Sequence, residues 1–154
     1  MSKPLTPGVG WVVAQMILLA VQLTYPLTAG LSFSGWSVWA GASVMTLAGT
    51  FALWALKTLG RSLTPLPKPK DDAVLVVAGP YRWVRHPIYS ALLLVCGGWA
   101  VMWVSSILLA LTATLFIIFL FKTQLEEQWL VLRYPEYEAY RKKTGRLIPR
   151  IFGR

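Results

Sequence analysis

The sequence predicts an all-α membrane protein with about four transmembrane helices, and three observations support this prediction. The 154-residue chain is 56% hydrophobic, with a mean hydropathy of +0.56. Only 14% of its residues are charged, against about 25% in soluble domains. No Lys, Arg, Asp or Glu occurs in residues 4–56 or 86–121. A soluble domain of this size could not bury so much apolar surface, so we expect a single membrane domain, residues 1–154.

Two apolar segments in the first half match the length of transmembrane helices. Residues 11–29 and 36–59 each come close to or exceed the about 20 residues that cross a hydrocarbon core. The first segment lacks a small-residue cleavage site and a second span follows at once, so it is not interpreted as a signal peptide. Ala48 and Ala52 either form a small-xxx-small pair for close helix packing or are ordinary apolar filler.

Residues 60–86 interrupt the apolar pattern. Gly60 ends the helical stretch, and prolines at positions 65, 67 and 69 oppose a new helix. Ordered loops of this length are uncommon in small domains and are usually functional. We therefore expect a cytoplasmic loop that contributes to the site and could close over it.

The uncharged run at residues 86–121 is too long for one transmembrane helix. It would extend about 54 Å, against a hydrocarbon core of about 30 Å. It is therefore predicted to form a helical hairpin with spans near 87–104 and 106–121 and a turn at 105–106. Glycines 97–98 are expected to permit close packing rather than to make the turn.

The helical pattern continues past the last apolar run. Leu125 and Trp129 recur at helical spacing, so the fourth helix is expected to project from the membrane until Pro135. Residues 122–154 should form a cytoplasmic C-terminal extension with a second short helix at 136–143.

The distribution of charge predicts the topology. Four spans place both termini and the central loop on one side of the membrane, and that side carries all 15 Lys and Arg residues. The positive-inside rule assigns it to the cytoplasm. The net charge of +9 lies beside membrane spans, so anionic lipid, and not nucleic acid, is the expected partner of the basic face. No metal site is predicted, and the oligomeric state is left open.

Function is expected at the cytoplasmic face, because the predicted spans lack the ionisable groups that transporters and proton relays need. Two polar clusters flank the predicted hairpin and should lie at one membrane level, in contact. The first contains Arg82, Arg85, His86 and Tyr89, and the second contains Glu126, Glu127, Arg133, Tyr137, Tyr140, Arg141 and Arg146.

Four motifs follow one another along the chain. They are Gly-Pro-Tyr-Arg-x-x-Arg-His-Pro-x-Tyr at 79–89, Glu-Glu-x-x-Leu at 126–130, Tyr-Pro-Glu-Tyr-x-x-Tyr at 134–140, and Ile148-Pro149. In this order and spacing the chain resembles the integral-membrane methyltransferases related to isoprenylcysteine carboxyl methyltransferase and the phospholipid N-methyltransferases. The resemblance covers roughly residues 59–151. The N-terminal half carries no such motif, and substrate choice could depend on it.

The resemblance implies S-adenosylmethionine as cofactor and methyl transfer as reaction. It assigns His86, Tyr89 and Glu126 to the cofactor, with Tyr81, Arg82 and Glu127 as supports. Arginines and an imidazole suit the amino-acid carboxylate of this cofactor, and glutamates suit its hydroxyls and cationic end.

Two residues are assigned catalytic roles. His86 is the base that a thiol or amine acceptor would need, whereas a carboxylate acceptor needs none. Arg133, seven residues after Glu126, is expected either to orient that carboxylate or to meet an anionic substrate.

Simpler interpretations remain open at this stage. Arg82 and Arg85 could hold lipid phosphates, and Glu127 could be only an ion-pair partner. Two other classes of protein are also compatible with the sequence. One is an NADPH-dependent membrane reductase related to the sterol reductases, whose C-terminal region is similar. The other is a non-enzymatic scaffold that binds lipid. The methyltransferase interpretation expects a lipophilic acceptor that enters from the bilayer.

Overall fold

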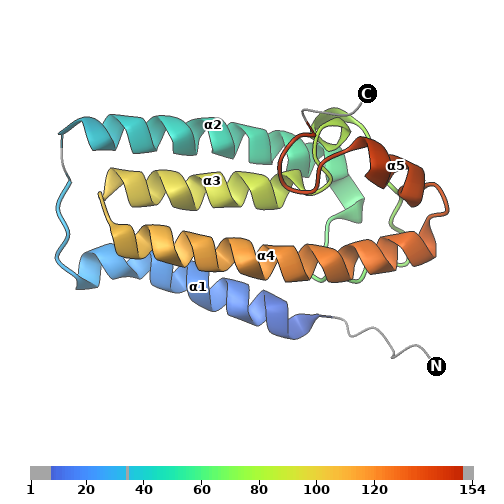
Figure 1. Cartoon of the computed structure of the whole chain (residues 1–154), viewed down its shortest axis with the longest axis horizontal. Helices are drawn as coiled ribbons and strands as arrows, with labels where there is room; N and C mark the ends of the chain where they lie inside the picture. The colour runs from blue at the N-terminus through green and yellow to red at the C-terminus, as the bar shows by residue number, and fades with distance from the viewer. Residues whose placement is uncertain (1–7, 34, 151–154) are drawn as a thin grey trace.

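A computed structural model describes residues 8–33 and 35–150, and these residues form an all-α fold. Four long helices lie side by side, and the loop after α2 gathers with the short α5 at one end of the bundle (Figure 1). The α-helices are α1 (Val9–Thr28), α2 (Gly35–Leu59), α3 (Pro87–Met102), α4 (Ser106–Arg133) and α5 (Tyr137–Lys143). The predicted fold class is confirmed for this part of the chain.

Three of these helices are long and apolar enough to cross a membrane, namely α1, α2 and α4. The fourth, α3, has 16 residues and ends at Met102, short of the expected residue 104. It extends about 24 Å, less than a hydrocarbon core of about 30 Å. The number of spans therefore stays a prediction.

The predicted limits of α4 agree well with the structure. Its N-terminus follows the expected turn, where the Ser105 hydroxyl caps the helix by accepting a hydrogen bond from Leu108 N at 3.3 Å. The helix then continues unbroken past residue 121 and ends before Pro135. The short helix after it begins at Tyr137, one residue later than expected.

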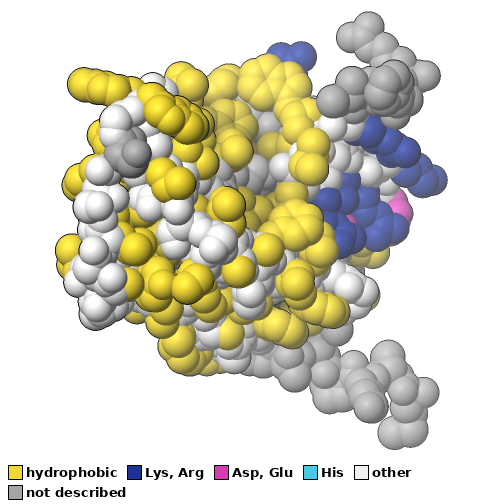
Figure 2. Space-filling model, turned by 60° about the vertical axis from the view of Figure 1, so that its left-hand side comes forward, with side chains coloured by type: hydrophobic (Ala, Val, Ile, Leu, Met, Phe, Trp, Pro, Cys, Tyr) yellow, Lys and Arg dark blue, Asp and Glu magenta, His cyan; other side chains and the backbone are white. Residues whose placement is uncertain are grey.

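The surface of the bundle is largely apolar. Hydrophobic side chains cover most of the face in Figure 2, and Lys and Arg gather towards one end. Large exposed residues include Trp36, Trp39 and Leu27, which are 74%, 77% and 76% exposed. An apolar surface this extensive needs a lipid environment, so the chain is a membrane protein.

Small side chains let α2 and α3 pack closely. The buried residues of α2 are all small: Ser37, Gly41, Ala48 and Ala55. The expected partner of Ala48 in the small-xxx-small pair, Ala52, is only half-buried. Of the two interpretations left open for Ala48 and Ala52, a fully buried pair is therefore not observed, and the buried small residues of α2 are spaced by four and seven residues.

The two glycines of α3 differ in a way that can be tested. A Cβ atom at Gly98 would lie 2.9 Å from Gly41 O and 2.8 Å from Met45 Cγ, whereas a Cβ atom at Gly97 would meet nothing within 4 Å. Gly98→Ala should therefore destabilise the protein in detergent by about 1–3 kcal/mol through overpacking. Gly97→Ala is the control and should be neutral or stabilising, since alanine favours a helix. Equal melting temperatures for the two variants would contradict this packing.

The first helix is tied to the bundle by Gln22, which is buried. Its side-chain amide donates to Cys96 O at 3.2 Å and to Thr112 Oγ1 at 3.0 Å, and its backbone carbonyl accepts from Trp99 Nε1 at 2.9 Å. Polar contacts of this kind hold helices together in an apolar environment. They fix α1 against α3 and α4, so that its N-terminal half becomes one wall of the site.

Candidate functional site

A cavity of about 330 Å³ lies at the end of the bundle where the loop and α5 gather. Its walls come from α1, the loop after α2, the beginning of α3, the second half of α4, and α5. This volume is within the range of small-molecule sites, about 300–1,000 Å³. Elements far apart in the sequence therefore enclose one site.

Backbone hydrogen bonds place the start of α3 against the segment that follows α5. Arg85 N donates to Gly145 O at 2.8 Å and His86 N donates to Arg146 O at 3.1 Å. Leu147 then enters the apolar core, and its carbonyl accepts from Ser90 Oγ at 2.6 Å. The C-terminal segment thus fixes the backbone of residues 85–86 at the mouth of the bundle.

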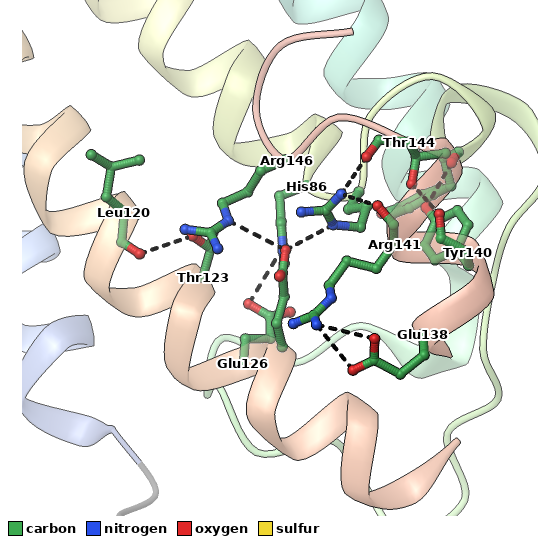
Figure 3. Close-up of polar contacts among 12 residues, drawn as sticks. His86, Leu120, Thr123, Glu126, Glu138, Tyr140, Arg141, Thr144 and Arg146 are labelled. Carbon is green, nitrogen blue, oxygen red and sulfur yellow. Dashed lines mark hydrogen bonds and ion pairs between the residues drawn. The ribbon is translucent and has the colours of Figure 1, made fainter. Parts of the chain in front are cut away.

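One carboxylate contacts two guanidinium groups and an imidazole. Glu127 Oε1 lies 2.8 Å from Arg85 Nε, 3.2 Å from His86 Nε2 and 3.5 Å from Arg146 Nε, and Figure 3 shows His86 and Arg146 converging there. Glu127 is only 2% exposed and does not line the cavity. These four residues, the Glu127 cluster, form a network around a buried carboxylate that joins the segment before α3, α4 and the C-terminal segment.

The neighbouring carboxylate faces the cavity. Glu126 Oε2 accepts a hydrogen bond from Tyr89 OH at 3.1 Å and lies 3.8 Å from His86 Nδ1. The Tyr89 ring is stacked between His86 and Phe119, at centroid distances of 5.7 Å and 4.7 Å. One imidazole therefore lies between two consecutive glutamates, and packing holds Tyr89 in place to support the one that faces the cavity.

Three tyrosines supply hydroxyl groups around the cavity. Burial raises the pKa of Tyr140 to about 12 and raises the pKa of Tyr81 and Tyr137 further, so all three are neutral donors at physiological pH. Tyr140 OH donates to Tyr81 O at 2.6 Å. Tyr137 OH is buried without a hydrogen-bond partner among the described residues. A buried hydroxyl without a partner in a cavity wall is a candidate ligand donor.

The loop after α2 covers one side of the cavity and is held to the projecting end of α4. Tyr134 OH donates to Ala73 O at 2.6 Å, and Arg133 Nη2 donates to Asp71 O. Several loop residues between Ser62 and Val76 line the cavity, as expected if the loop contributes to the site.

The predicted site residues fall into two groups. Tyr81, His86, Tyr89 and Glu126 line the cavity. Arg82, Arg133 and Glu127 do not: the two arginines are exposed, and Glu127 is buried outside the cavity lining in its own cluster.

The surroundings of two arginines bear on what the sequence suggested for them. Arg133 contacts Asp71 and the Tyr134 ring rather than Glu126, because the two-turn separation along α4 is about 10 Å and its side chain meets the loop instead. The alternative left open for Arg85, contact with lipid phosphate, is not supported by its surroundings, because its side chain is only 8% exposed and pairs with Glu127.

Two polar residues of the cavity lining, Lys122 and Gln15, were not predicted from the sequence. Lys122, 1% exposed, donates to Gln15 Oε1 of α1 at 2.7 Å and lies 4.9 Å from the centroid of the Tyr89 ring. The available signal was the four-residue spacing between Lys122 and Glu126, which places both on one helix face. Because Lys122 follows directly after the apolar run that ends at residue 121, it resembles an ordinary lysine at a membrane edge, and the spacing to Glu126 was not considered.

The fold and the site together define a class: a helical membrane protein with a cavity at one end that is lined by a carboxylate, an imidazole and tyrosines. The phospholipid methyltransferase family model matches residues 36–137, about two thirds of the chain, and the chain belongs to this family. The resemblance expected from the motifs is confirmed.

Two curated relatives are similar over most of this chain. A methanethiol S-methyltransferase from Pseudomonas deceptionensis is 36% identical over 118 residues, which cover 75% of this chain and 44% of that protein. The cobalt-zinc-cadmium resistance protein CzcN from Cupriavidus metallidurans is 33% identical over 138 residues, which cover 85% and 62%. The aligned region thus spans less than two thirds of either relative.

Proposed function

We propose that this membrane methyltransferase uses S-adenosylmethionine and methylates a lipophilic acceptor at the cytoplasmic face. The observation that carries the proposal is the position of Glu126, a carboxylate supported by Tyr89 and His86 inside a cavity that is otherwise largely apolar. A carboxylate in such a setting suits a ligand that combines a cationic end, hydroxyl groups and an aromatic base.

The side chains around the cavity fit that cofactor. Glu126 would accept hydrogen bonds from its hydroxyls or its ammonium group, and the hydroxyl of Tyr137, which has no partner among the described residues, would donate to it. Apolar loop residues such as Leu75 and Val76 suit the adenine ring. When bound, the cofactor supplies an electrophilic methyl group on a sulfonium. The protein then contributes positioning and the exclusion of water.

The acceptor decides whether a base is required. A carboxylate needs none, whereas an amine or thiol must lose a proton. One relative is named for methylation of methanethiol, and this favours a thiol among the three acceptor types. In that case His86 is the proposed base. Glu127 holds its Nε2 at 3.2 Å, which leaves Nδ1 on the Glu126 side of the ring.

The two sides of the cavity suit two routes of access. Val12 and Met16 of the apolar α1 form one wall, and the polar loop forms another. We propose that the lipophilic acceptor enters from the bilayer beside α1 and that the cofactor enters past the loop. The basic face around this end would bind anionic lipid.

The proposed topology has four spans with the loop, α5 and both termini in the cytoplasm. It can be tested with single cysteines at exposed positions, because the native Cys96 is buried. Ser106→Cys should react only with a reagent added outside, and Lys143→Cys only after the membrane is permeabilised. Labelling of both variants from the same side would contradict the four-span model.

The loop is proposed to close over the bound cofactor. Bound S-adenosylhomocysteine should then slow tryptic cleavage after the exposed Arg61 and Lys70. Arg133→Ala removes the hydrogen bond to Asp71 O and should speed cleavage after Lys70, with little effect on the rate of methyl transfer at saturating cofactor. If ligand-free and ligand-bound protein are cleaved at equal rates, the loop is only a tether.

The proposed function is tested by titrating purified protein with S-adenosylhomocysteine and with NADPH. Binding of the first alone supports the proposal, and binding of NADPH alone would support a membrane reductase. Binding of neither would favour a lipid-binding scaffold. A methylation assay with labelled cofactor, on lipid extract and on small thiols, would then identify the acceptor.

A further inference from the structure

Lys122 is a buried lysine to which the proposed function assigns no role. It lies in α4, is 1% exposed and lines the cavity. Its ammonium group donates to the neutral Gln15 side chain at 2.7 Å and lies 4.9 Å from the centroid of the Tyr89 ring. A buried charge is costly unless an opposite charge or several hydrogen bonds compensate it, so this environment is incomplete for an ammonium with three N–H donors.

The acid nearest along the helix does not close an ion pair with Lys122. Glu126 is one turn further along and also lines the cavity, yet none of the ion pairs among the described residues joins the two. A lysine that precedes a glutamate by four residues is the weaker orientation for such a pair. Instead, Gln15 and the Tyr89 ring hold the ammonium, and Tyr89 OH and His86 support the carboxylate.

The cavity lining therefore contains a basic and an acidic side chain one helical turn apart on α4. This arrangement is complementary to an α-amino acid, whose carboxylate and ammonium are separated by one carbon atom. The other strong cation in the lining, Arg85, is already engaged by Glu127 and by the carbonyls of Arg141 and Thr144. Arg82, which sequence analysis expected to support the cofactor, is exposed and outside the lining.

We infer that Lys122, held by Gln15 of α1, binds the carboxylate of the cofactor's amino-acid moiety while Glu126 receives its ammonium group. This inference rests on the proposed function and deepens it. It also gives α1 a role in the site, although the family match begins at residue 36 and leaves α1 outside.

The test compares two ligands that differ in the amino-acid moiety. S-adenosylhomocysteine carries it, and methylthioadenosine is the same nucleoside thioether without it. Calorimetry on purified Lys122→Met should show about a 10- to 100-fold loss of affinity for S-adenosylhomocysteine and less than about a twofold change for methylthioadenosine. Lys122→Gln keeps a donor but removes the charge, and should show the same selective loss if the methionine variant folds poorly. Lys143→Gln, at an exposed position of α5, is the control and should match wild type for both ligands.

The outcomes separate this inference from the proposed function. Failure of the wild-type protein to bind S-adenosylhomocysteine would overturn both. Wild-type binding with an equal loss of both ligands in the Lys122 variants would overturn only the inference, because Lys122 would then merely hold α1 against α4. Unchanged affinity for S-adenosylhomocysteine would also overturn it, and a raised KM for an anionic acceptor alone would assign Lys122 to that acceptor instead.

Discussion

Replacing Glu127 with glutamine is expected to destabilise the protein by about 3–5 kcal/mol, the largest effect on stability that the structure predicts. The variant leaves the Arg85 side chain, 8% exposed, without its anion and replaces the carboxylate beside His86 Nε2 with a neutral amide. Breaking a buried pair by removing one partner costs more than the pair contributes, because the remaining charge has lost its hydration. Thermal unfolding in detergent micelles measures the difference in stability.

The matched control for this variant is Glu138→Gln. Glu138 also pairs with an arginine, Arg141, at 3.0 Å, but the two side chains are 44% and 43% exposed. Removal of an exposed pair changes stability by about 0–1 kcal/mol. If the two variants unfolded at the same temperature, the Glu127 cluster would not stabilise the end of the bundle.

Replacing the adjacent Glu126 with glutamine should lower the affinity for the cofactor and leave the stability of the fold almost unchanged. The variant keeps the shape of the side chain and its contact with Tyr89 but removes the charge that faces the cavity. A charged hydrogen bond in a partly desolvated site contributes about 1.5–3 kcal/mol, so affinity for S-adenosylhomocysteine should fall by roughly 10- to 150-fold. Stability should change little, since the Glu126 side chain is 24% exposed. Calorimetric titration of the folded variant measures the loss.

Glu136→Gln is the control for binding, because Glu136 is exposed and lies outside the cavity lining. It should bind S-adenosylhomocysteine as the wild type does. Wild-type affinity in Glu126→Gln would show that Glu126 is not a ligand. Glu126 and Glu127 would then differ only in how deeply they are buried and not in ligand binding.

Much of the fold could be predicted because charge and apolar length act locally. The absence of charge in residues 86–121 predicted the helices on either side of Ser105, and the Ser105 cap confirms the position of the turn. Pro135 ended α4 as expected, since the residue before a proline disfavours helix. The 16-residue length of α3 was not predictable, because apolar composition continues through the turn.

The candidate site was harder to predict than the helices. The motifs brought together His86, Tyr89 and Glu126, and the structure places them in contact. They did not separate Glu126 from Glu127, since consecutive residues on a helix point about 100° apart and only the packing decides which one faces the cavity. The wall formed by α1 was also hidden, because a tertiary contact joins Gln15 to Lys122 across 107 residues of sequence.

The central claim is that the cavity between α1, the loop and α4 holds S-adenosylmethionine. Ultraviolet cross-linking of cofactor labelled in its methyl group, followed by mass-spectrometric mapping, tests this claim most directly. The label should appear in peptides from residues 59–89 or 122–140 and should be lost in the presence of excess S-adenosylhomocysteine. Label that maps only to the opposite end of the bundle, around residues 28–33 or 103–108, would contradict the claim.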